Sequence, residues 1–329
     1  MLNSTRSHTG SHSIDPCGWD HRLHTLSKLL SRQLDSYARL VNESDTRSLW
    51  ITGAGGLIGS CLADQSALHS RIWRTHAWTR ADLDLADHQA VDNAYKKTRP
   101  SLIIHCAAIS KSTACDANPP MARQVNVEST RVLCEIAGET PVWFLSTDLV
   151  FDGKSGGYAE NTAVNPLTFY GQTKVEAERH VLRHPRNAVF RLSLNGGRSP
   201  TGDRGFNEEF RRSVESGKTM KLFVDEFRCP ASADMTATAL WKLAALDELP
   251  HGIFHLCGGD RLSRYQIGRL LLRRWGMDGS ALQSGSILDY QGPPRSRDTS
   301  MTCARAETLL NGPLPGLEGW LDGNPEAPF

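Results

Sequence analysis

Short apolar segments alternate with amphipathic ones between Ser48 and about Leu194. "SLIIHCAAI" and "PVWFLSTDLVF" are apolar stretches, whereas "DHQAVDNAYKKT" and "YGQTKVEAERHVLR" carry apolar residues three and four positions apart. The first pattern is typical of buried strands and the second of helices. Strands of this kind separated by helices predict an α/β fold, in which helices cover both faces of a doubly wound parallel sheet.

The pattern changes on either side of this region. Residues 1–47 begin with a polar stretch rich in Ser, His, Gly and Thr, which predicts disorder. Leucines spaced three and four apart from Leu23 to Leu34 then predict a helix, which either packs on the main domain or pairs with a second copy in a homodimer. Beyond Leu194 the alternation becomes irregular and rich in loops. Segments such as "MTATALWKLAALDEL" and "SRYQIGRLLLRRW" predict a smaller C-terminal lobe there.

Composition narrows the class of protein. The chain has 329 residues, 39% of them hydrophobic and 22% charged, with a formal net charge of +1. No strong field therefore favours nucleic acid or a membrane surface. No apolar run is long enough for a membrane span, and the polar N-terminus is unlike a signal peptide. The eight cysteines are scattered without CxxC pairs, which is typical of reduced thiols in a cytoplasmic protein.

The stretch "TGAGGLIGS" joins the first predicted strand to the first predicted helix. Gly53, Gly56 and Gly59 stand in the spacing G-x-x-G-x-x-G. Glycines there permit a tight turn, close approach to a pyrophosphate and close packing of helix on strand. The helix N-terminus adds free N–H groups and a positive dipole end. This context predicts a Rossmann-type site for NAD(P).

The end of the second predicted strand bears on the choice between NAD and NADP. Thr79 and Arg80 occupy the position where an acid would hold a ribose 2′-hydroxyl, and the first acid is Asp82. A basic residue there can accept a 2′-phosphate, so the sequence favours NADPH, with NADH as the alternative. A solvated surface role for Arg80 is equally compatible. Asp84 and Leu85 follow at a position that can contact adenine.

The strand "LIIHCAAIS" ends in two small residues. Ala107 and Ala108 leave room for a flat cofactor at the end of a parallel strand, where ligands of such sheets bind. His105 and Cys106 precede them. We expect both to pack within or beside the strand rather than to act on a substrate.

"FYGQTK" places Tyr170 and Lys174 four positions apart, on one face of a helix. Spacing alone does not distinguish a working acid and its partner from an exposed helix face. The chemistry of ketone reduction suits the pair, because a tyrosine can donate a proton. A nearby cation stabilises the phenolate and so lowers its pKa.

Several stretches together resemble a known family. In order they are "TGAGGLIG", "HCAAIS", "QVNVESTRVL", "FLSTDLVFDG", "NPLTFYGQTKVEAE" and "VFRLSL". They resemble the extended short-chain dehydrogenase/reductase superfamily and, within it, the dTDP-4-dehydrorhamnose reductase group, from about Leu49 to about Leu310. The resemblance implies a Rossmann domain over 48–195 and, over 196–329, mainly a substrate-binding lobe. It also implies hydride transfer from a nicotinamide cofactor to the 4-keto group of a nucleotide-bound sugar.

The resemblance assigns roles residue by residue. It implies catalysis by Thr147, Tyr170 and Lys174, the last two also contacting the cofactor. The other cofactor contacts it implies are Gly53, Gly56, Leu57, Ile58, Gly59, Arg80, Asp84, Leu85, Ala107 and Ala108. Candidate substrate contacts are Ser146, Asp148, Asn195, Phe206, Arg228 and Arg295. Arg295, with Arg297, is of a type that binds diphosphate. No metal site is predicted.

Two departures and two alternatives stay open. Leu149 stands where the family often has tyrosine, which can change the sugar accepted, and residues 1–47 have no family counterpart. One alternative is a non-catalytic NADP-binding regulator resembling the methionine adenosyltransferase beta subunit, for which the N-terminal helix would suit a partner. The other is a nucleotide-sugar epimerase or dehydratase, although these more often carry serine-rich versions of the "STD" stretch.

Overall fold

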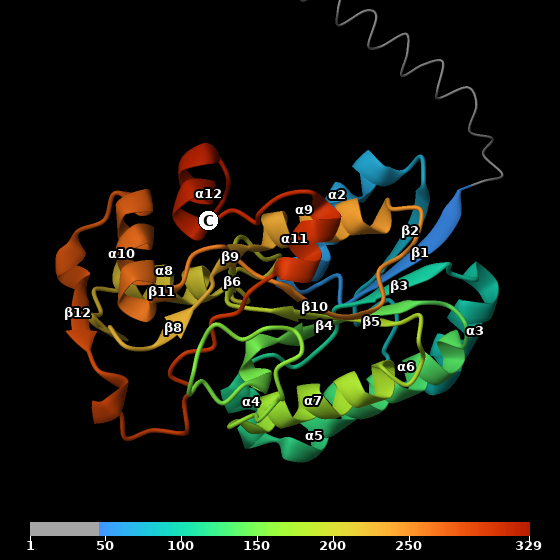
Figure 1. The fold of residues 1–329 in the computed structure, drawn as a ribbon, viewed down its shortest axis with the longest axis horizontal. Helices are drawn as coiled ribbons and strands as arrows, with labels where there is room; N and C mark the ends of the chain where they lie inside the picture. Colours follow the sequence, from blue (N-terminus) through green and yellow to red (C-terminus); the bar gives the residue numbers. More distant parts are fainter. Residues whose placement is uncertain (1–45) are drawn as a thin grey trace, which may run out of the picture. The chain divides into compact units, whose positions relative to one another are not determined.

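A parallel sheet of six strands forms the centre of the part of the chain that the structure describes, residues 46–329 of a computed structural model (Figure 1). The strands stand in the order β10–β5–β4–β3–β1–β2. Their bounds are β1 Arg47–Thr52, β2 Trp73–Trp78, β3 Leu102–His105, β4 Val142–Thr147, β5 Ala188–Leu192 and β10 Gly252–Leu256. The order reverses between β1 and β3, and ligands of open α/β sheets bind at such a reversal. The disorder and the helix predicted before residue 46 lie outside the described residues.

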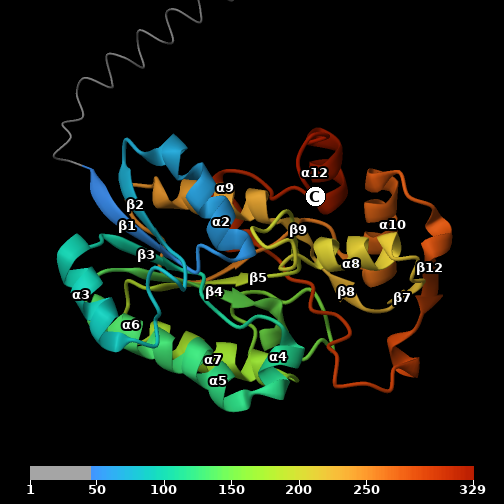
Figure 2. The ribbon, with the colours of Figure 1, turned by 180° about the vertical axis from the view of Figure 1, so that it is seen from behind.

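Helices cover both faces of this sheet, as the apolar strands require (Figure 2). One face carries α2 (Leu57–Gln65), α9 (Ala233–Ala244) and α11 (Ala304–Leu310). The other carries α3 (His88–Thr98), α4 (Ser112–Ala117), α5 (Pro119–Arg123), α6 (Ser129–Ala137) and α7 (Phe169–Val181). A π-helical stretch, Gln124–Glu128, links α5 to α6. The predicted α/β fold with a parallel sheet is confirmed.

The core explains why the strands are apolar on both faces. Leu49 and Ile51 of β1 pack in the cluster under α2 and α9, whereas Trp50 between them joins the cluster under α3 and α6. All three side chains are fully buried. Burying a side chain of this size contributes about 1.5–3 kcal/mol, so a polar residue at any of these positions would be costly.

The C-terminal part of the chain builds a smaller lobe beside the carboxyl ends of the strands (Figure 1). It contains α8 (Phe206–Glu215), α10 (Arg264–Trp275), α12 (Leu317–Gly323) and three small sheets: β7 (Met220–Phe223) with β12 (Leu282–Gly285), β8 (Phe227–Arg228) with β11 (Leu262–Ser263), and β6 (Asn195–Gly196) with β9 (Ala231–Ser232). Residues 196–329 also supply β10, α9 and α11 to the sheet layers. The two predicted parts are therefore interleaved after Asn195.

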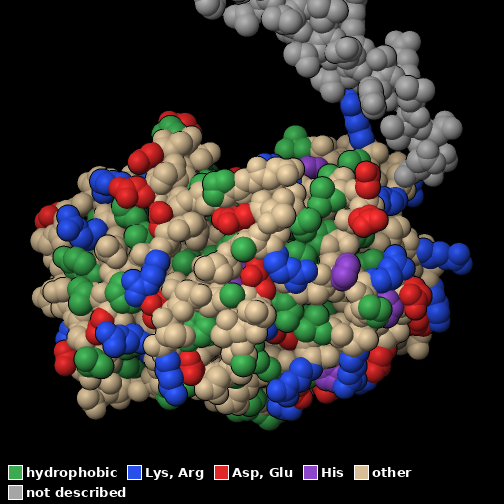
Figure 3. Space-filling view, viewed as in Figure 1, with side chains coloured by type: hydrophobic (Ala, Val, Ile, Leu, Met, Phe, Trp, Pro, Cys, Tyr) green, Lys and Arg blue, Asp and Glu red, His purple; other side chains and the backbone are tan. Residues whose placement is uncertain are grey.

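The surface charges and the cysteines of the described residues are those of an ordinary globular protein. Charged side chains of both signs are interspersed on the face shown in Figure 3, in keeping with the net charge of +1. Within residues 46–329, no helix combines the length and apolar character of a membrane span. The seven cysteines of this part are free thiols.

Candidate active site

A cavity of about 440 Å³ opens where the carboxyl ends of the sheet strands face the C-terminal lobe. It brings together glycines after β1, the end of β4, the first turns of α7 and arginines of the lobe. The predicted residues that line it are Gly53, Gly56, Leu57, Ile58, Gly59, Ala108, Ser146, Thr147, Asp148, Tyr170, Lys174, Asn195, Phe206, Arg228 and Arg295. Arg80, Asp84, Leu85 and Ala107 do not line it.

The glycine turn has no room for side chains. Gly53 adopts φ +69°, and a Cβ there would lie 2.6 Å from the backbone nitrogen of Ala107. A Cβ on Gly59 would lie 2.3 Å from the carbonyl oxygen of Gly53. Among the described residues no side chain caps α2 at Gly56, and Gly56 to Gly59 at this helix start line the cavity. This uncapped, positively polarised helix end fits the pyrophosphate of a dinucleotide.

The end of β2 lies apart from the cavity. The Arg80 Nε lies 3.6 Å from Asp84 Oδ2, with both side chains largely exposed. Asp82 closes the turn by accepting bonds from the backbone nitrogen and Oγ1 of Thr79, at 3.0 and 2.6 Å. Leu85 packs against the core cluster under α3. Among residues 46–329, the one ion pair of Arg80 is this exposed contact with Asp84.

The three predicted catalytic side chains meet in the cavity. Tyr170 and Lys174 lie one turn apart on α7, whose N-cap, Thr168, accepts a bond from the Gly171 backbone. Thr147 ends β4 and lines the same cavity, and its hydroxyl donates to Asp148 Oδ1 at 3.2 Å. Lys174 Nζ donates to the Leu145 carbonyl at 2.7 Å. β4 and α7 thus bring a phenol, a hydroxyl and a lysine side chain together in one cavity.

The pKa values of the pair depart from the expected pattern. Burial and the Asp148 carboxylate raise the pKa of Tyr170, against a smaller lowering by the Thr147 hydroxyl. The net lowering of the Tyr170 pKa that was expected is not found, because burial of the phenol dominates. Burial also lowers the pKa of Lys174 to about 7, and the charge of Glu178 opposes that shift.

His105 and Cys106 are not reactive groups. His105 is fully buried and its ring nitrogens lie 2.7 Å from Thr52 Oγ1 and 3.0 Å from Thr130 Oγ1. Burial lowers the pKa of His105 to about 3, so the ring is neutral. Cys106 touches the cavity, but burial raises its pKa to about 12 and keeps it a thiol. The prediction that these residues pack at the strand is confirmed.

Two of the candidate substrate-binding residues, Asp148 and Asn195, already have hydrogen-bond partners within the protein. Asp148 accepts hydrogen bonds from Ser193 at 3.0 Å and Thr299 at 2.7 Å. The Asn195 amide bonds Thr236 and the Ser193 carbonyl at 2.7 and 3.0 Å. Both side chains are therefore fixed before any ligand arrives, and each keeps only part of its hydrogen-bonding capacity for one.

Three arginines surround one buried carboxylate at the lobe end of the cavity. Arg228 and Arg295 both bond Glu226, at 3.0 and 2.9 Å, and Arg228 Nε lies 3.7 Å from Asp148 Oδ2. No described side chain accepts a hydrogen bond from Arg264, whose guanidinium lies 5.6 Å from the Phe206 ring. Burial and the neighbouring arginines lower the pKa of Arg264 to about 10, so it stays charged at neutral pH. The group carries excess positive charge towards the cavity.

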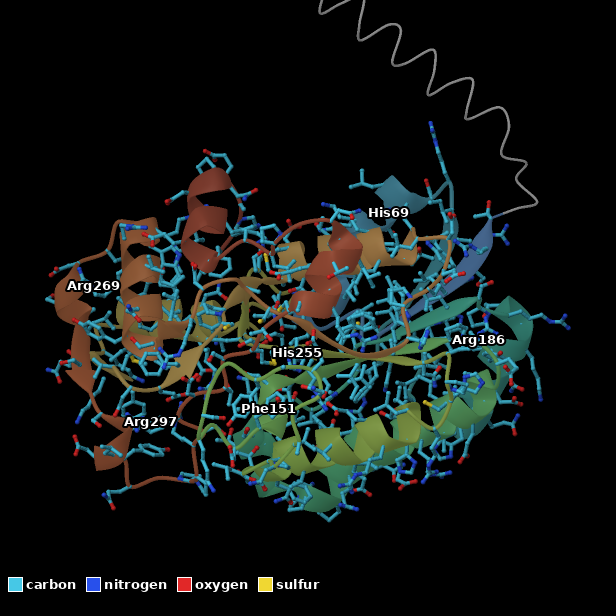
Figure 4. The ribbon with its side chains drawn as sticks, in the orientation of Figure 1. His69, Phe151, Arg186, His255, Arg269 and Arg297 are labelled. Carbon is cyan, nitrogen blue, oxygen red and sulfur yellow. The ribbon has the colours of Figure 1, made fainter. Side chains whose placement is uncertain are left out.

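Sequence reasoning missed part of this group. Arg264 and Glu226 were not predicted, and Arg297, which was, does not line the cavity (Figure 4). The capping box between Ser263 and Gln266 marks where α10 begins, and so puts Arg264 in its first turn. No local pattern shows that this turn faces the cavity, because that depends on how the lobe packs.

Comparisons with known proteins show which family the chain belongs to. The family model of the RmlD substrate binding domain matches residues 47–320. The methionine adenosyltransferase 2 subunit beta of Danio rerio is 28% identical over 274 residues, covering 80% of this chain and 85% of that protein. A probable low-salt glycan biosynthesis reductase of Haloferax volcanii is 29% identical over 287 residues, covering 82% and 94%.

Solved structures have the same fold. The dTDP-4-dehydrorhamnose reductase of Bacillus anthracis in complex with NADP superposes with a TM-score of 0.77 at 21% identity, covering 84% of this chain and 98% of that one. A hypothetical dTDP-4-dehydrorhamnose reductase of Sulfolobus tokodaii gives 0.71 at 26% identity, covering 84% and 99%. The chain belongs to the RmlD family of extended short-chain dehydrogenases/reductases.

Proposed function

We propose that the protein is an NAD(P)H-dependent reductase of a 4-keto nucleotide sugar. The observation that carries this proposal is a single cavity with a dinucleotide turn at one end, Thr147, Tyr170 and Lys174 in the middle and an arginine group at the other end. The likeness to a probable glycan biosynthesis reductase supports a reductive role. The preference for NADPH rests on Arg80 alone.

The side chains divide the chemistry of ketone reduction. A bound nicotinamide cofactor would supply the hydride. Tyr170 donates the proton to the carbonyl oxygen, and its raised pKa keeps that proton in place until an alkoxide, a stronger base than a phenolate, develops. The Thr147 hydroxyl orients this oxygen beside Tyr170. The Lys174 ammonium stabilises the tyrosinate left after proton transfer.

The lobe end of the cavity suits a diphosphate. Arg264 has unused donors, and Arg295 is partly exposed with one carboxylate partner. Guanidinium groups bind phosphate oxygens in pairs of hydrogen bonds, which a neutral sugar alone would not require. A nucleotide diphosphate attached to the sugar would satisfy these arginines while the ketone lies beside Tyr170.

The test is turnover with defined keto-sugars. Purified protein should oxidise NADPH when given dTDP-4-dehydrorhamnose or a UDP-linked relative, measured by the loss of absorbance at about 340 nm. Free 4-keto sugar without the nucleotide serves as the matched control and should react far more slowly. Equal rates with both would contradict the diphosphate site. No turnover on any nucleotide-linked ketone would contradict the proposal.

The likeness to the methionine adenosyltransferase 2 subunit beta supports a second candidate, a cofactor-binding regulatory subunit. It predicts NADPH binding without turnover and co-purification with a partner enzyme. Pull-down of the full chain, with and without residues 1–45, tests this. Epimerases and dehydratases among the structural neighbours are about 19% identical. This likeness supports a common fold but gives no support for a shared reaction. Homodimer formation through the N-terminal extension stays a prediction.

A further inference from the structure

A buried ion pair joins α7 to β5, and neither of its two residues lines the cavity. Arg191 of β5 bonds Glu178 of α7 through Nη2 to Oε2 at 2.8 Å and Nε to Oε1 at 3.1 Å. Both side chains are 4% exposed. Ser146 of β4, the register partner of Arg191, donates to Glu178 Oε1 at 2.5 Å. Two neighbouring strands therefore hold this one carboxylate.

Helical spacing places the Glu178 carboxylate on the same face of α7 as Tyr170 and Lys174. Tyr170, Lys174 and Glu178 follow one another at four-residue intervals on α7, so they share one face of the helix. Lys174 stands between the other two. Its ammonium bonds the Leu145 carbonyl and lies 3.8 Å from the centre of the Phe144 ring. Among the described residues no carboxylate bonds Lys174 directly, so any negative charge acts on it through space.

The energetics favour a role beyond packing. Removing two charges from water costs several kcal/mol per ion, and well-packed apolar residues often replace such pairs without loss of stability. Packing alone would therefore be served by an apolar pair between α7 and β5. A carboxylate bonded by Arg191 and Ser146 one turn from Lys174 provides something an apolar pair does not, which is a negative charge held in one place.

We propose that Glu178 is a positioning residue of the reductase site, fixed by Ser146 and Arg191 so that its carboxylate keeps the Lys174 ammonium charged beside Tyr170. This inference rests on the proposed function for its effect on turnover, but not for its effect on Lys174.

The other titratable groups facing Lys174 do not supply that charge. His105 of β3 is neutral, with a pKa lowered by burial to about 3. Burial also raises the pKa values of the thiols Cys106 and Cys115, so both are uncharged at neutral pH. Lys174 has a pKa of about 7, at which a modest change in local charge alters its protonation. Glu178 is the leading influence that opposes the desolvation of this lysine.

Titration of Lys174 tests the inference without any substrate. Protein carrying ¹³C at the lysine ε-carbon should show one resonance with a midpoint near 7, assigned by its loss in Lys174→Arg, while ordinary lysines titrate near about 10.4. In Glu178→Gln this midpoint should fall by about one pH unit or more. The matched control is Glu176→Gln on the same helix, which removes a partly exposed partner of Arg123 and should leave the midpoint unchanged. Equal midpoints in wild type and Glu178→Gln would overturn the inference.

A double variant separates charge from folding. Glu178→Gln leaves Arg191 buried without its carboxylate and is expected to lower the melting temperature. Glu178→Gln/Arg191→Met removes both charges and should recover the melting temperature while the Lys174 midpoint stays low. A midpoint restored to the wild-type value in the double variant would reduce the pair to a structural role and overturn the inference.

Turnover supplies the second readout. The charged lysine is the active form, so kcat should fall as pH rises through the Lys174 pKa, and Glu178→Gln should move this fall to lower pH with little change in KM. A purely structural defect would reduce kcat by the same factor at every pH. Absence of turnover in the wild type would contradict the proposed function and leave the lysine titration to decide this inference.

Discussion

The two ends of the cavity are built in different ways. At the end proposed for the cofactor, one short stretch, "TGAGGLIG", supplies the turn, and side chains have no room at Gly53 and Gly59. At the end proposed for the substrate, the cavity is lined by charged side chains: Arg228 of β8, Arg264 at the start of α10 and Arg295 in the loop before α11. A site formed by the backbone of one short stretch can be predicted from sequence, whereas a site whose side chains are brought together by packing is much harder to predict.

Tyr170→Phe should have the largest effect, because this residue lies where the two ends meet. Loss of the proton donor is expected to lower kcat by about 10²–10⁴-fold, the usual range for general acid catalysis. Binding of cofactor and of substrate should be retained, because the phenyl ring still fills the buried position. NADPH affinity from fluorescence titration should therefore stay within about twofold of the wild type. Unchanged turnover would contradict the assignment of Tyr170 as the acid.

Arg264→Gln should affect the substrate end alone. Losing charge-assisted bonds to a diphosphate, each worth about 1.5–3 kcal/mol, should raise KM for the nucleotide sugar by about 10–100-fold. NADPH affinity should not change. Arg269→Gln on the same helix is the matched control, because Arg269 is exposed and lies away from the cavity (Figure 4). An equal loss of affinity for cofactor and sugar would break the division between the two ends.

Gly59→Ala should affect the cofactor end. Its Cβ would lie 2.3 Å from the backbone oxygen of Gly53, so α2 must shift away from β1. We expect a loss of about 1–3 kcal/mol in the free energy of unfolding and about tenfold weaker NADPH binding. Gly319→Ala in α12, where a Cβ meets nothing within 4 Å, is the control; it should leave NADPH affinity unchanged and raise the free energy of unfolding slightly, by about 0.5–1 kcal/mol. Wild-type cofactor affinity in Gly59→Ala would show that the turn does not hold the pyrophosphate.

The same contrast explains how far sequence reasoning reached. Apolar strands predicted the parallel sheet and the glycine stretch predicted the turn after its first strand, because both depend on local pattern. The resemblance in "STDLVFDG" and "FYGQTK" located Thr147, Tyr170 and Lys174 in one cavity. The raised pKa of Tyr170 was not predictable, since it depends on burial and on Asp148. Arg264 and Glu178 were missed because their partners lie far away in sequence and only packing brings them together.

Arg80→Ala should have the smallest effect. It tests whether the residue at the end of β2 contributes to binding at the cofactor end. Its side chain is 78% exposed and is paired only with Asp84 at 3.6 Å, so an exposed contact with a 2′-phosphate contributes about 0.2–1 kcal/mol. NADPH affinity should fall by at most about fivefold, and NADH affinity should not change. The ratio of the two dissociation constants, measured by fluorescence, reports this difference.

The matched control for Arg80 is Arg186→Ala, an exposed arginine of a turn remote from the cavity (Figure 4). If the effect of Arg80 is local, Arg186→Ala leaves both affinities unchanged. If the effect is one of net charge, Arg186→Ala weakens NADPH binding as much as Arg80→Ala does. Raising the salt concentration should weaken NADPH binding to the wild type more than to Arg80→Ala, because an exposed ion contact is screened. If Arg80→Ala weakens NADH as much as NADPH, Arg80 does not read the 2′-phosphate, and the cofactor end selects its ligand through the glycine turn alone.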